Sequence, residues 1–354
     1  MKEKVLLALS GGVDSSVCAI LLAQKKYEVV ACAIKMHDNS DISAAKSVAD
    51  YLGIELVIKD LTGDFRDIVL NNFCNEYING RTPNPCVLCN KDIKWKALIE
   101  TADELNINKI ATGHYANIKY NTDFNTYSVS VSKDIHKDQT YMLWRLPQKY
   151  LSRTIFPLGE IESKLEVRKL ALTNKLPSFD KGDSQDICFI TDGDYRLFLQ
   201  NYLINNNIQA ELSGNIILNE KIIGKHSGIF NYTVGQRRGL GISYSEPLYI
   251  KSINFNKNEI EVGVEKNLYS NGLVATNINT MKYPAEKFPE KEYLVKIRYK
   301  DFGKPAICSI VDNKLIIKFN ERRKSVTSGQ SAVLYEDGEV VAGGIISAPL
   351  DMNI

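Results

Sequence analysis

A short stretch of small and polar residues near the start of the chain has the composition of a phosphate-binding loop. Residues 10–16 read Ser-Gly-Gly-Val-Asp-Ser-Ser and follow the apolar run 5–9. Two successive glycines let the backbone approach a ligand closely and adopt positive φ. The helix expected after them presents unpaired N–H groups at its positive end, which is where phosphate binds. The plainer alternative is a strand-to-helix turn with a serine or aspartate cap, but the complete string favours phosphate binding.

The loop differs from the two commonest nucleotide motifs. It has no Gly-Lys-Ser/Thr, as a Walker A loop would, and no Gly-x-Gly-x-x-Gly, as a dinucleotide fold would. It resembles instead the Ser-Gly-Gly-x-Asp-Ser loop of the ATP pyrophosphatases. This resemblance implies that the loop holds the β- and γ-phosphates of ATP while the α-phosphate adenylates a carbonyl oxygen and pyrophosphate leaves.

Three of the seven cysteines stand in settings that suit chemistry, namely Cys86, Cys89 and Cys188. The others lie in apolar patterns or have no motif around them, and an odd count in a long chain argues against a disulfide framework. We expect Cys89 at the start of a helix, where free N–H groups and the nearby Lys91 and Lys94 would favour its thiolate.

Three interpretations of these cysteines compete. A structural zinc site needs four ligands, and no second Cys-x-x-Cys completes one. Cys86 and Cys89 could equally be unrelated loop thiols. In the third interpretation, Cys89 and Cys188 are partners across an active site. The phosphate loop favours this one, because adenylation followed by thiol attack makes a single coherent reaction.

The elements that must position these groups alternate along the first part of the chain. The pattern predicts strands at 4–9, 28–36, 54–60 and 109–112, and helices at 14–26, 41–53, 63–79 and 91–105. Such alternation predicts a parallel sheet with helices on both faces. Ligands bind at the carboxyl ends of parallel strands, which is where the glycine loop, Met36, Gly113 and His114 would lie.

The sequence pattern changes after about residue 200, where short β-like segments are separated by Gly, Asn, Asp or Pro. We therefore predict an α/β catalytic domain at 1–200, a small central β-rich domain at 201–265 and a C-terminal β-barrel at 266–354.

Composition restricts the function classes only broadly. The chain has 354 residues, of which 44% are hydrophobic and 24% charged, with a net charge of +2. Residues 81–96 and 266–354 each carry an excess of three positive charges, which is compatible with contact to a phosphate backbone. The apolar runs are shorter than a membrane span or a signal peptide, so we expect a cytoplasmic protein without a membrane partner.

Taken together, the motifs resemble those of the bacterial tRNA-specific 2-thiouridylases, the MnmA family, along nearly the whole chain. The matching stretches, in order, are 8–15, 82–90, 111–116, 137–139, 182–188, 232–241, 298–299 and 328–330. The resemblance implies an N-terminal domain of the adenine nucleotide alpha hydrolase type, followed by the central domain and the barrel. It also implies two substrates, ATP with Mg²⁺ and a tRNA with a wobble uridine, of the Lys, Glu and Gln isoacceptors.

The resemblance assigns roles residue by residue. Cys89 would be the nucleophile, and Cys188 would carry a persulfide loaded by an upstream sulfur donor. ATP would be bound by Ala8, Leu9, Ser10, Gly11, Gly12, Val13, Asp14, Ser15, Met36 and Gly113. The target base and the rest of the tRNA would be contacted by Asn84, Pro85, Cys86, His114, Lys137, Asp138, Gln139, Arg298, Tyr299 and Gln330. Asp14 is a plausible Mg²⁺ contact, with helix capping as the alternative.

One departure from the family pattern leaves the sulfur route open. Some members have Asp where this chain has Cys86. Three cysteines could hold a [4Fe–4S] cluster with one iron free to bind sulfide. We expect the persulfide route, with Cys86, Cys89 and Cys188 as cluster ligands in the alternative.

Two other functions stay open from the residues themselves. A different adenylating enzyme, such as an amide-forming synthetase, would explain the glycine loop but not the cysteines. A non-catalytic RNA-binding or iron–sulfur protein would explain the barrel and the cysteines but not the loop.

Overall fold

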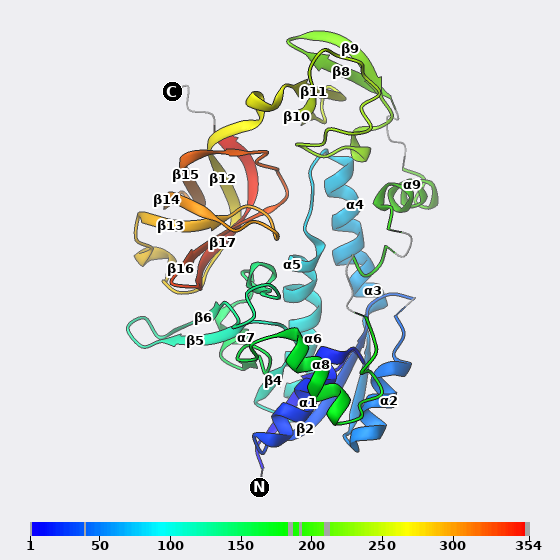
Figure 1. The fold of residues 1–354 in the computed structure, drawn as a ribbon, viewed down its shortest axis with the longest axis vertical. Coiled ribbons are helices and arrows are strands. Elements are labelled where there is room, and N and C mark those ends of the chain that lie inside the picture. The colour runs from blue at the N-terminus through cyan, green and yellow to red at the C-terminus, as the bar shows by residue number, and fades with distance from the viewer. Residues whose placement is uncertain (1, 39, 183–186, 191–192, 209–212, 351–354) are drawn as a thin grey trace.

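The computed structural model describes residues 2–38, 40–182, 187–190, 193–208 and 213–350. Three units follow one another along the chain, and Figure 1 shows the α/β unit at the bottom, the barrel at the left and the central unit at the top. This confirms the predicted fold class. No helix among the described residues is long and apolar enough to cross a membrane.

The first unit is built on a five-stranded parallel sheet in the order β3-β2-β1-β4-β7. Its strands are β1 (Lys4–Ala8), β2 (Glu28–Lys35), β3 (Leu56–Asp60), β4 (Lys109–Ala111) and β7 (Thr154–Ile155). The chain moves outward from β1 to β3 and then returns to the other side of β1. The order of strands therefore reverses between β1 and β4, and in such sheets the crevice at the reversal is the usual ligand site.

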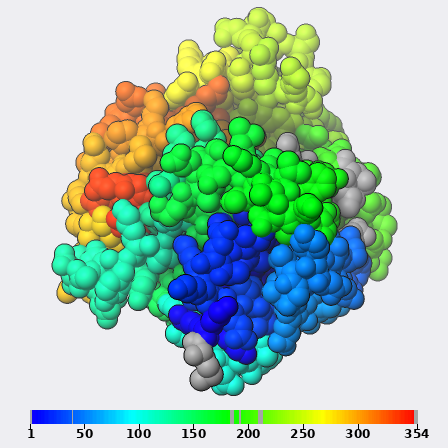
Figure 2. All heavy atoms as spheres, turned by 60° about the horizontal axis from the view of Figure 1, so that its bottom comes forward, coloured from blue at the N-terminus to red at the C-terminus, as the bar shows by residue number. Residues whose placement is uncertain are grey.

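Alternate residues of β1 pack on opposite faces of the sheet, as a buried parallel strand requires. Val5 and Leu7 share a core with α1 (Val13–Gln24), α2 (Ser43–Leu52) and α8 (Lys164–Thr173), whereas Leu6 packs with Trp95 and with Leu98 of α6 (Lys96–Glu104). Figure 2 shows the green region around α8 lying against the dark-blue N-terminal residues, with α2 beside them.

Two long helical runs contain π turns. The first joins α3 (Thr62–Phe65), η1 (Arg66–Leu70) and α4 (Asn71–Ile78), and the second joins α5 (Pro85–Cys89), η2 (Asn90–Trp95) and α6. The second run begins at Pro85, a residue favoured at the first helical position. The predicted helix at 91–105 therefore starts six residues too late, because the proline-containing segment before it suggested a loop.

The central unit contains α9 (Tyr195–Asn205) and a four-stranded sheet in the order β10-β11-β8-β9. The strands are β8 (Gly214–Leu218), β9 (Lys221–His226), β10 (Tyr249–Asn254) and β11 (Glu259–Gly263). A separate apolar core, with Ile216, Ile250 and Ile260 fully buried, holds this sheet together.

The C-terminal unit is a closed antiparallel barrel. Its strands are β12 (Tyr269–Thr280), β13 (Lys291–Lys296), β14 (Lys304–Val311), β15 (Lys314–Lys324), β16 (Ser331–Glu336) and β17 (Glu339–Leu350). They follow the order β12-β15-β14-β13-β16-β17, and the pairing of β12 with β17 closes the barrel.

A hairpin from the first unit extends the barrel's sheet. Its strands, β5 (Asn117–Asn121) and β6 (Thr126–Ser130), lie beside β17 through the pairing of Glu339 with Ser130. This hairpin is not among the strands predicted from the sequence. The strand that it packs against lies about 200 residues away in the chain, so no local sequence pattern predicts this pairing.

Candidate active site

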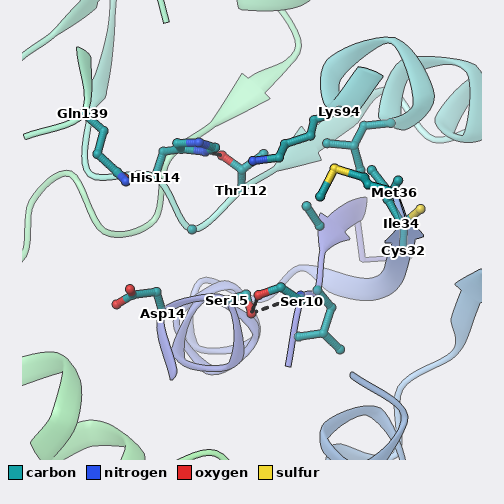
Figure 3. A pocket seen from close by; sticks show the side chains of 14 residues that line it. Ser10, Asp14, Ser15, Cys32, Ile34, Met36, Lys94, Thr112, His114 and Gln139 are labelled. Carbon is teal, nitrogen blue, oxygen red and sulfur yellow. Dashed lines mark hydrogen bonds between the residues drawn. The ribbon is translucent and has the colours of Figure 1, made fainter. Parts of the chain in front are cut away.

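A cavity of about 330 Å³ lies at the carboxyl ends of β1, β2 and β4, at the reversal of the strand order. That volume is within the range of small-molecule sites. Figure 3 shows Ser10, Asp14 and Ser15 on one side of it and Lys94, Thr112 and His114 on the opposite side. Its wall includes these residues of the sequence-based site: Ala8, Leu9, Ser10, Asp14, Ser15, Met36, Gly113, His114 and Gln139.

The glycine loop owes its shape to one strained position. Gly11 has a φ of +74°, and a Cβ there would lie 2.4 Å from the carbonyl carbon of Ala44 in α2. Glycine is therefore required at this position. Gly12 precedes α1 without a side-chain capping bond, so the first turn of the helix keeps its N–H groups for a ligand. Gly11, Gly12 and Val13 shape the turn and are not part of the cavity wall.

Serine side chains fix the loop from within. The Ser15 hydroxyl lies 3.1 Å from Ser10 Oγ and 3.1 Å from the Gly12 carbonyl oxygen, to which it donates. Ser16 donates to the same carbonyl at 2.8 Å. A loop held by its own hydroxyls is rigid before any ligand arrives, which reduces the entropy lost on binding.

Asp14 is engaged in an ion pair and does not cap α1. Its two carboxylate oxygens each lie 2.7 Å from Lys164 Nζ at the start of α8, and the Tyr115 hydroxyl donates to one of them at 2.7 Å. Neither partner could be predicted from the sequence, because Tyr115 lies 101 residues and Lys164 150 residues from Asp14 in the chain.

His114 is a neutral residue of the cavity wall. Thr112 Oγ1 lies 2.9 Å from its Nδ1, and its ring lies 5.2 Å from that of Trp95. Burial lowers the pKa of His114 to about 3, with the positive charge of Lys94 as a further cause. A neutral imidazole can hydrogen-bond a base or a hydroxyl, but it adds no positive charge for phosphate.

The three candidate cysteines come together beside the cavity, on α5 and on the segment 187–190. Cys86 and Cys188 are exposed and Cys89 is buried, and all three are free thiols. Each thiol lies within electrostatic range of the other two and of Lys94. Cys89 also contacts the cavity wall directly, because its Sγ lies 3.7 Å from the sulfur of Met36.

The expected thiolate at Cys89 is wrong for the ligand-free protein. Cys89 ends α5 and continues directly into η2, so it has no free helix N-terminus beside it. Its side chain is only 5% exposed, and burial raises the pKa of the thiol to about 12, against the opposing effect of Lys94. Desolvation therefore outweighs the positive charge.

Lys94 connects the thiols with the cavity, and the π turn η2 explains how. A separation of five residues in an α-helix would turn Lys94 about 140° away from Cys89. A π turn instead brings residues i and i+5 together. Burial alone would lower the pKa of Lys94, but the nearby Cys89, Cys86 and Cys188 raise it overall. From the sequence, Lys94 is only a charge near Cys89, because a π turn has no recognisable sequence pattern.

Several of the residues expected to contact tRNA belong to two groups of hydrogen bonds that join the barrel to the site, which we call the two bridges. In the first, the Tyr299 hydroxyl lies 3.4 Å from the Asp138 carbonyl oxygen, and Gln139 next to it donates to and accepts from the backbone of Tyr115. Arg298 is fixed by the carbonyls of residues 324 and 325, each 3.1 Å from its guanidinium. The carboxylate of Asp138 accepts from Thr140, and Lys137 precedes it in the same loop.

The second bridge holds the segment before α5. The Gln330 amide donates to the carbonyls of Thr82 at 2.9 Å and Pro83 at 3.2 Å, and the Thr82 amide donates to the Ser328 carbonyl at 2.9 Å. Asn84 follows, with its amide 3.3 Å from the sulfur of Met142. In the described structure the Gln330 side chain therefore supports the cysteine-bearing helix from the barrel.

Comparison with known proteins agrees with this organisation. The chain matches three family models along its length. They are described as a tRNA methyl transferase HUP domain at residues 3–192, a tRNA methyl transferase PRC-barrel domain at 198–264 and an aminomethyltransferase beta-barrel domain at 270–346. It is 40% identical to a tRNA-specific 2-thiouridylase MnmA of Caldicellulosiruptor saccharolyticus, over 99% of this chain and 100% of that protein.

The chain belongs to the tRNA-specific 2-thiouridylase family. A second relative of the same name, from Salinibacter ruber, is 42% identical over 98% of this chain and 94% of its own. Among solved structures, the U34-tRNA thiolase NcsA from Methanococcus maripaludis with its [4Fe–4S] cluster matches with a TM-score of 0.36 and 22% identity, over 58% of this chain and 66% of its own. As a member of the 2-thiouridylase family, the chain is an enzyme of the tRNA sulfurtransferase class.

Proposed function

We propose that this protein replaces the C2 oxygen of the wobble uridine in tRNA with sulfur, in two steps that share one site. ATP first adenylates the oxygen, and sulfur from a cysteine persulfide then displaces AMP. The main support for the proposal is that the cavity and the three-thiol cluster (Cys86, Cys89 and Cys188) share residues. Lys94 lines the cavity and lies within electrostatic range of all three thiols, and Met36 lines the cavity and contacts Cys89.

Activation uses the polar side of the cavity. The C2 carbonyl is a weak electrophile, and attaching the α-phosphate converts its oxygen into a leaving group. The N–H groups at the start of α1 would bind the departing pyrophosphate, and such preorganised donors contribute about 3–4 kcal/mol each in known enzymes. Lys94 faces this charge from the opposite wall (Figure 3).

A magnesium ion fits the donor chemistry of this wall. Mg²⁺ usually takes one or two carboxylates together with the phosphates of its nucleotide. Asp14 supplies such a carboxylate to the cavity, and a carboxylate has about four lone-pair positions, more than Lys164 and Tyr115 occupy. The ion would neutralise phosphate charge as pyrophosphate leaves.

Sulfur transfer uses the exposed and the buried thiol differently. Cys188 is exposed, so an upstream donor protein can load its sulfur as a persulfide. Cys89 gives up its thiol proton to solvent as its sulfur attacks Cys188 Sγ, and the terminal sulfur leaves with its electron pair as hydrosulfide. Hydrosulfide attacks the activated C2, AMP departs, and a Cys89–Cys188 disulfide remains. Alternatively, the terminal persulfide sulfur attacks C2 directly and expels AMP, and Cys89 then attacks Cys188 Sγ, which leaves the sulfur on C2 and forms the same disulfide.

The base must leave the stack of the anticodon loop to reach this site. Residues 84–86 lie at the start of α5, where they would meet the flipped uridine of the Lys, Glu and Gln isoacceptors. The loop 137–139 and Arg298–Tyr299 lie on the bridge from cavity to barrel, and they would contact the rest of the tRNA.

The iron–sulfur alternative would use the same three thiols as cluster ligands. Across the described residues, which include Cys86, Cys89 and Cys188, no three His, Cys, Asp or Glu side chains are arranged to hold a metal ion. The proposed reaction is therefore written with thiols.

An anaerobic sulfur-transfer assay tests the function. Protein loaded with persulfide is mixed with unmodified tRNA and ATP-Mg²⁺ without iron, and 2-thiouridine and AMP are measured by mass spectrometry. We expect both products, and their loss in Cys89→Ser and Cys188→Ser. Product that appears only after cluster reconstitution would refute the persulfide route. Adenylation that survives serine at both positions, without any thiolated tRNA, would point to a different adenylating enzyme.

A further inference from the structure

The proposed reaction gives no chemical task to the thiol of Cys86. This residue is exposed and lies one helical turn before the buried Cys89 in α5. Residues i and i+3 share one face of a helix, and ideal helix geometry separates their Cα atoms by about 5 Å. A disulfide spans Cα separations of about 4.4–6.8 Å, so these two thiols are within bonding reach of each other.

Cys86 is also part of the same cluster as Cys188. Cys89 lies within electrostatic range of both other thiols, and Cys188 within range of Cys86. Lys94 is a cation common to all three. The remaining four cysteines are all buried: Cys18 and Cys32 lie in the cores on the two faces of the parallel sheet, Cys74 lies in α4 and Cys308 in the barrel. Cys74 packs in the same apolar cluster as Cys89, but Cys86 and Cys188 are the thiols whose charge acts on Cys89.

The Cys89–Cys188 disulfide left by each turnover blocks the next one. Cys188 is the sulfur carrier, and it cannot be loaded while its sulfur is bonded to Cys89. Cys89 is only 5% exposed, so an external thiol can reach this bond only through the exposed Cys188 sulfur. A thiol already placed on the same helix reacts at a high effective concentration and needs no diffusional encounter.

We propose that Cys86 is the resolving thiol of this enzyme, an inference that rests on the proposed function. The Cys86 thiolate attacks Cys89 Sγ, a Cys86–Cys89 bond forms, and the Cys89–Cys188 bond breaks. The electron pair leaves on Cys188, whose thiolate lies beside Lys94 and is free to be loaded again. The exchange changes no net oxidation state. An external dithiol then supplies two electrons and two protons to the Cys86–Cys89 disulfide by attacking the exposed Cys86 sulfur.

The masses of two tryptic peptides distinguish the disulfides before and after this exchange. Trypsin places Cys86 and Cys89 on one peptide, residues 82–91, and Cys188 on another, residues 182–196. A Cys86–Cys89 bond makes the first peptide two hydrogens lighter. A Cys89–Cys188 bond instead joins the two peptides into one species.

The test is a single turnover of persulfide-loaded, desalted protein with tRNA and ATP-Mg²⁺ and no reductant, stopped at intervals by alkylation. In the native protein we expect the joined species first, and then the lighter 82–91 peptide together with alkylated Cys188. In Cys86→Ser the joined species should persist. With a dithiol present, the ratio of the steady-state rate to the first-turnover rate should fall about tenfold or more in Cys86→Ser, and taking this ratio cancels any loss of uridine contact at residue 86. Cys308→Ala, which removes a buried barrel thiol, serves as the control for the alkylation pattern.

The outcomes separate the two proposals. If thiolated tRNA forms while the joined species persists in the native protein and Cys86 remains alkylatable throughout, the resolving role is wrong and the proposed function stands. If Cys86→Ser loses the first turnover as completely as later ones, Cys86 acts before resolution and the inference is overturned. Absence of thiolated tRNA in the native protein would refute the proposed function itself.

Discussion

At the scale of single residues, charge and burial compete around the thiols. Cys89 is buried enough for desolvation to keep it protonated, and Lys94 is the cation that opposes this effect. The same Lys94 faces the phosphate loop across the cavity. A single side chain thus contributes to both halves of the proposed reaction.

Replacement of Lys94 by Met should therefore slow sulfur transfer and change its pH dependence. The thiolate of Cys89 is the reactive form, and Lys94 lowers the pKa of that thiol. Its removal raises this pKa further. In a plot of single-turnover rate against pH, the rising limb should therefore move to higher pH. Lys94→Arg keeps the charge and should keep the limb nearer its original position. An unchanged limb in Lys94→Met would show that Lys94 does not act on the thiol.

Gly11→Ala should destabilise the glycine loop by about 1–3 kcal/mol, the usual cost of a strained backbone position. The added Cβ meets the backbone of α2 at 2.4 Å, and φ is +74°. Gly12→Ala is a matched control, because its φ is −83° and its nearest contact would be Ser10 Oγ at 3.4 Å. Denaturant unfolding without ATP measures both. Equal losses in the two variants would contradict this account of the loop.

At the scale of elements, the site depends on segments that support one another from different units. The segment 82–84 has no regular structure, yet it must hold α5 and its cysteines in place. Its backbone is fixed from the barrel, by the Gln330 amide and the Ser328 carbonyl. Close packing adds to this, because a Cβ on Gly329 would lie 2.8 Å from the Thr82 carbonyl oxygen.

Gln330→Ala should loosen this segment even in the absence of tRNA. Two hydrogen bonds disappear, at a net contribution of about 0.5–1.5 kcal/mol each. Gln330→Glu should be worse, because a carboxylate would face two carbonyl oxygens that need a donor. Amide hydrogen exchange of residues 82–89 in the free protein should quicken in the order native, Ala, Glu. Exchange that stays unchanged while tRNA affinity falls would make Gln330 a tRNA contact only.

At the scale of the whole molecule, the α/β unit and the barrel share a hydrophobic core. Trp144 is fully buried, its indole N–H donates to Ser331 Oγ at 3.0 Å, and a Cβ on Gly343 would lie 2.5 Å from its ring. Val333 and Tyr335 of the barrel lie in the same cluster as Trp95. This shared core keeps the barrel at a fixed distance from the cavity and the thiols.

Trp144→Ala should therefore weaken the connection between the two units. Truncating a buried Trp costs about 3–5 kcal/mol. By calorimetry we expect one unfolding transition in the native protein and two in Trp144→Ala, because the units lose their common core. Tyr244→Ala, at a residue 51% exposed, is the control and should leave the transition in place. A single transition in Trp144→Ala, shifted no more than in the control, would show that the units fold independently of this contact.

The sequence by itself determined the features that depend on near neighbours. The glycine loop, the parallel strands around it and the helix start at α1 follow from short patterns of apolar, small and polar residues, and the structure confirms that fold class. The chemistry of the cysteines could also be suspected from their polar surroundings and the motifs around them. The variants described above test the roles of the individual residues.

Only the tertiary structure decided which distant groups meet. It brought Cys188 to Cys86 and Cys89, joined Asp14 to Lys164, turned Gln330 toward the segment before α5, and placed the β5–β6 hairpin beside the barrel. It also decided that Cys89 is protonated, because burial depends on everything packed around a side chain. These contacts join residues about 100 to 250 positions apart. Local propensity carries no information about such pairs, since they form only when the packing of whole units brings them together.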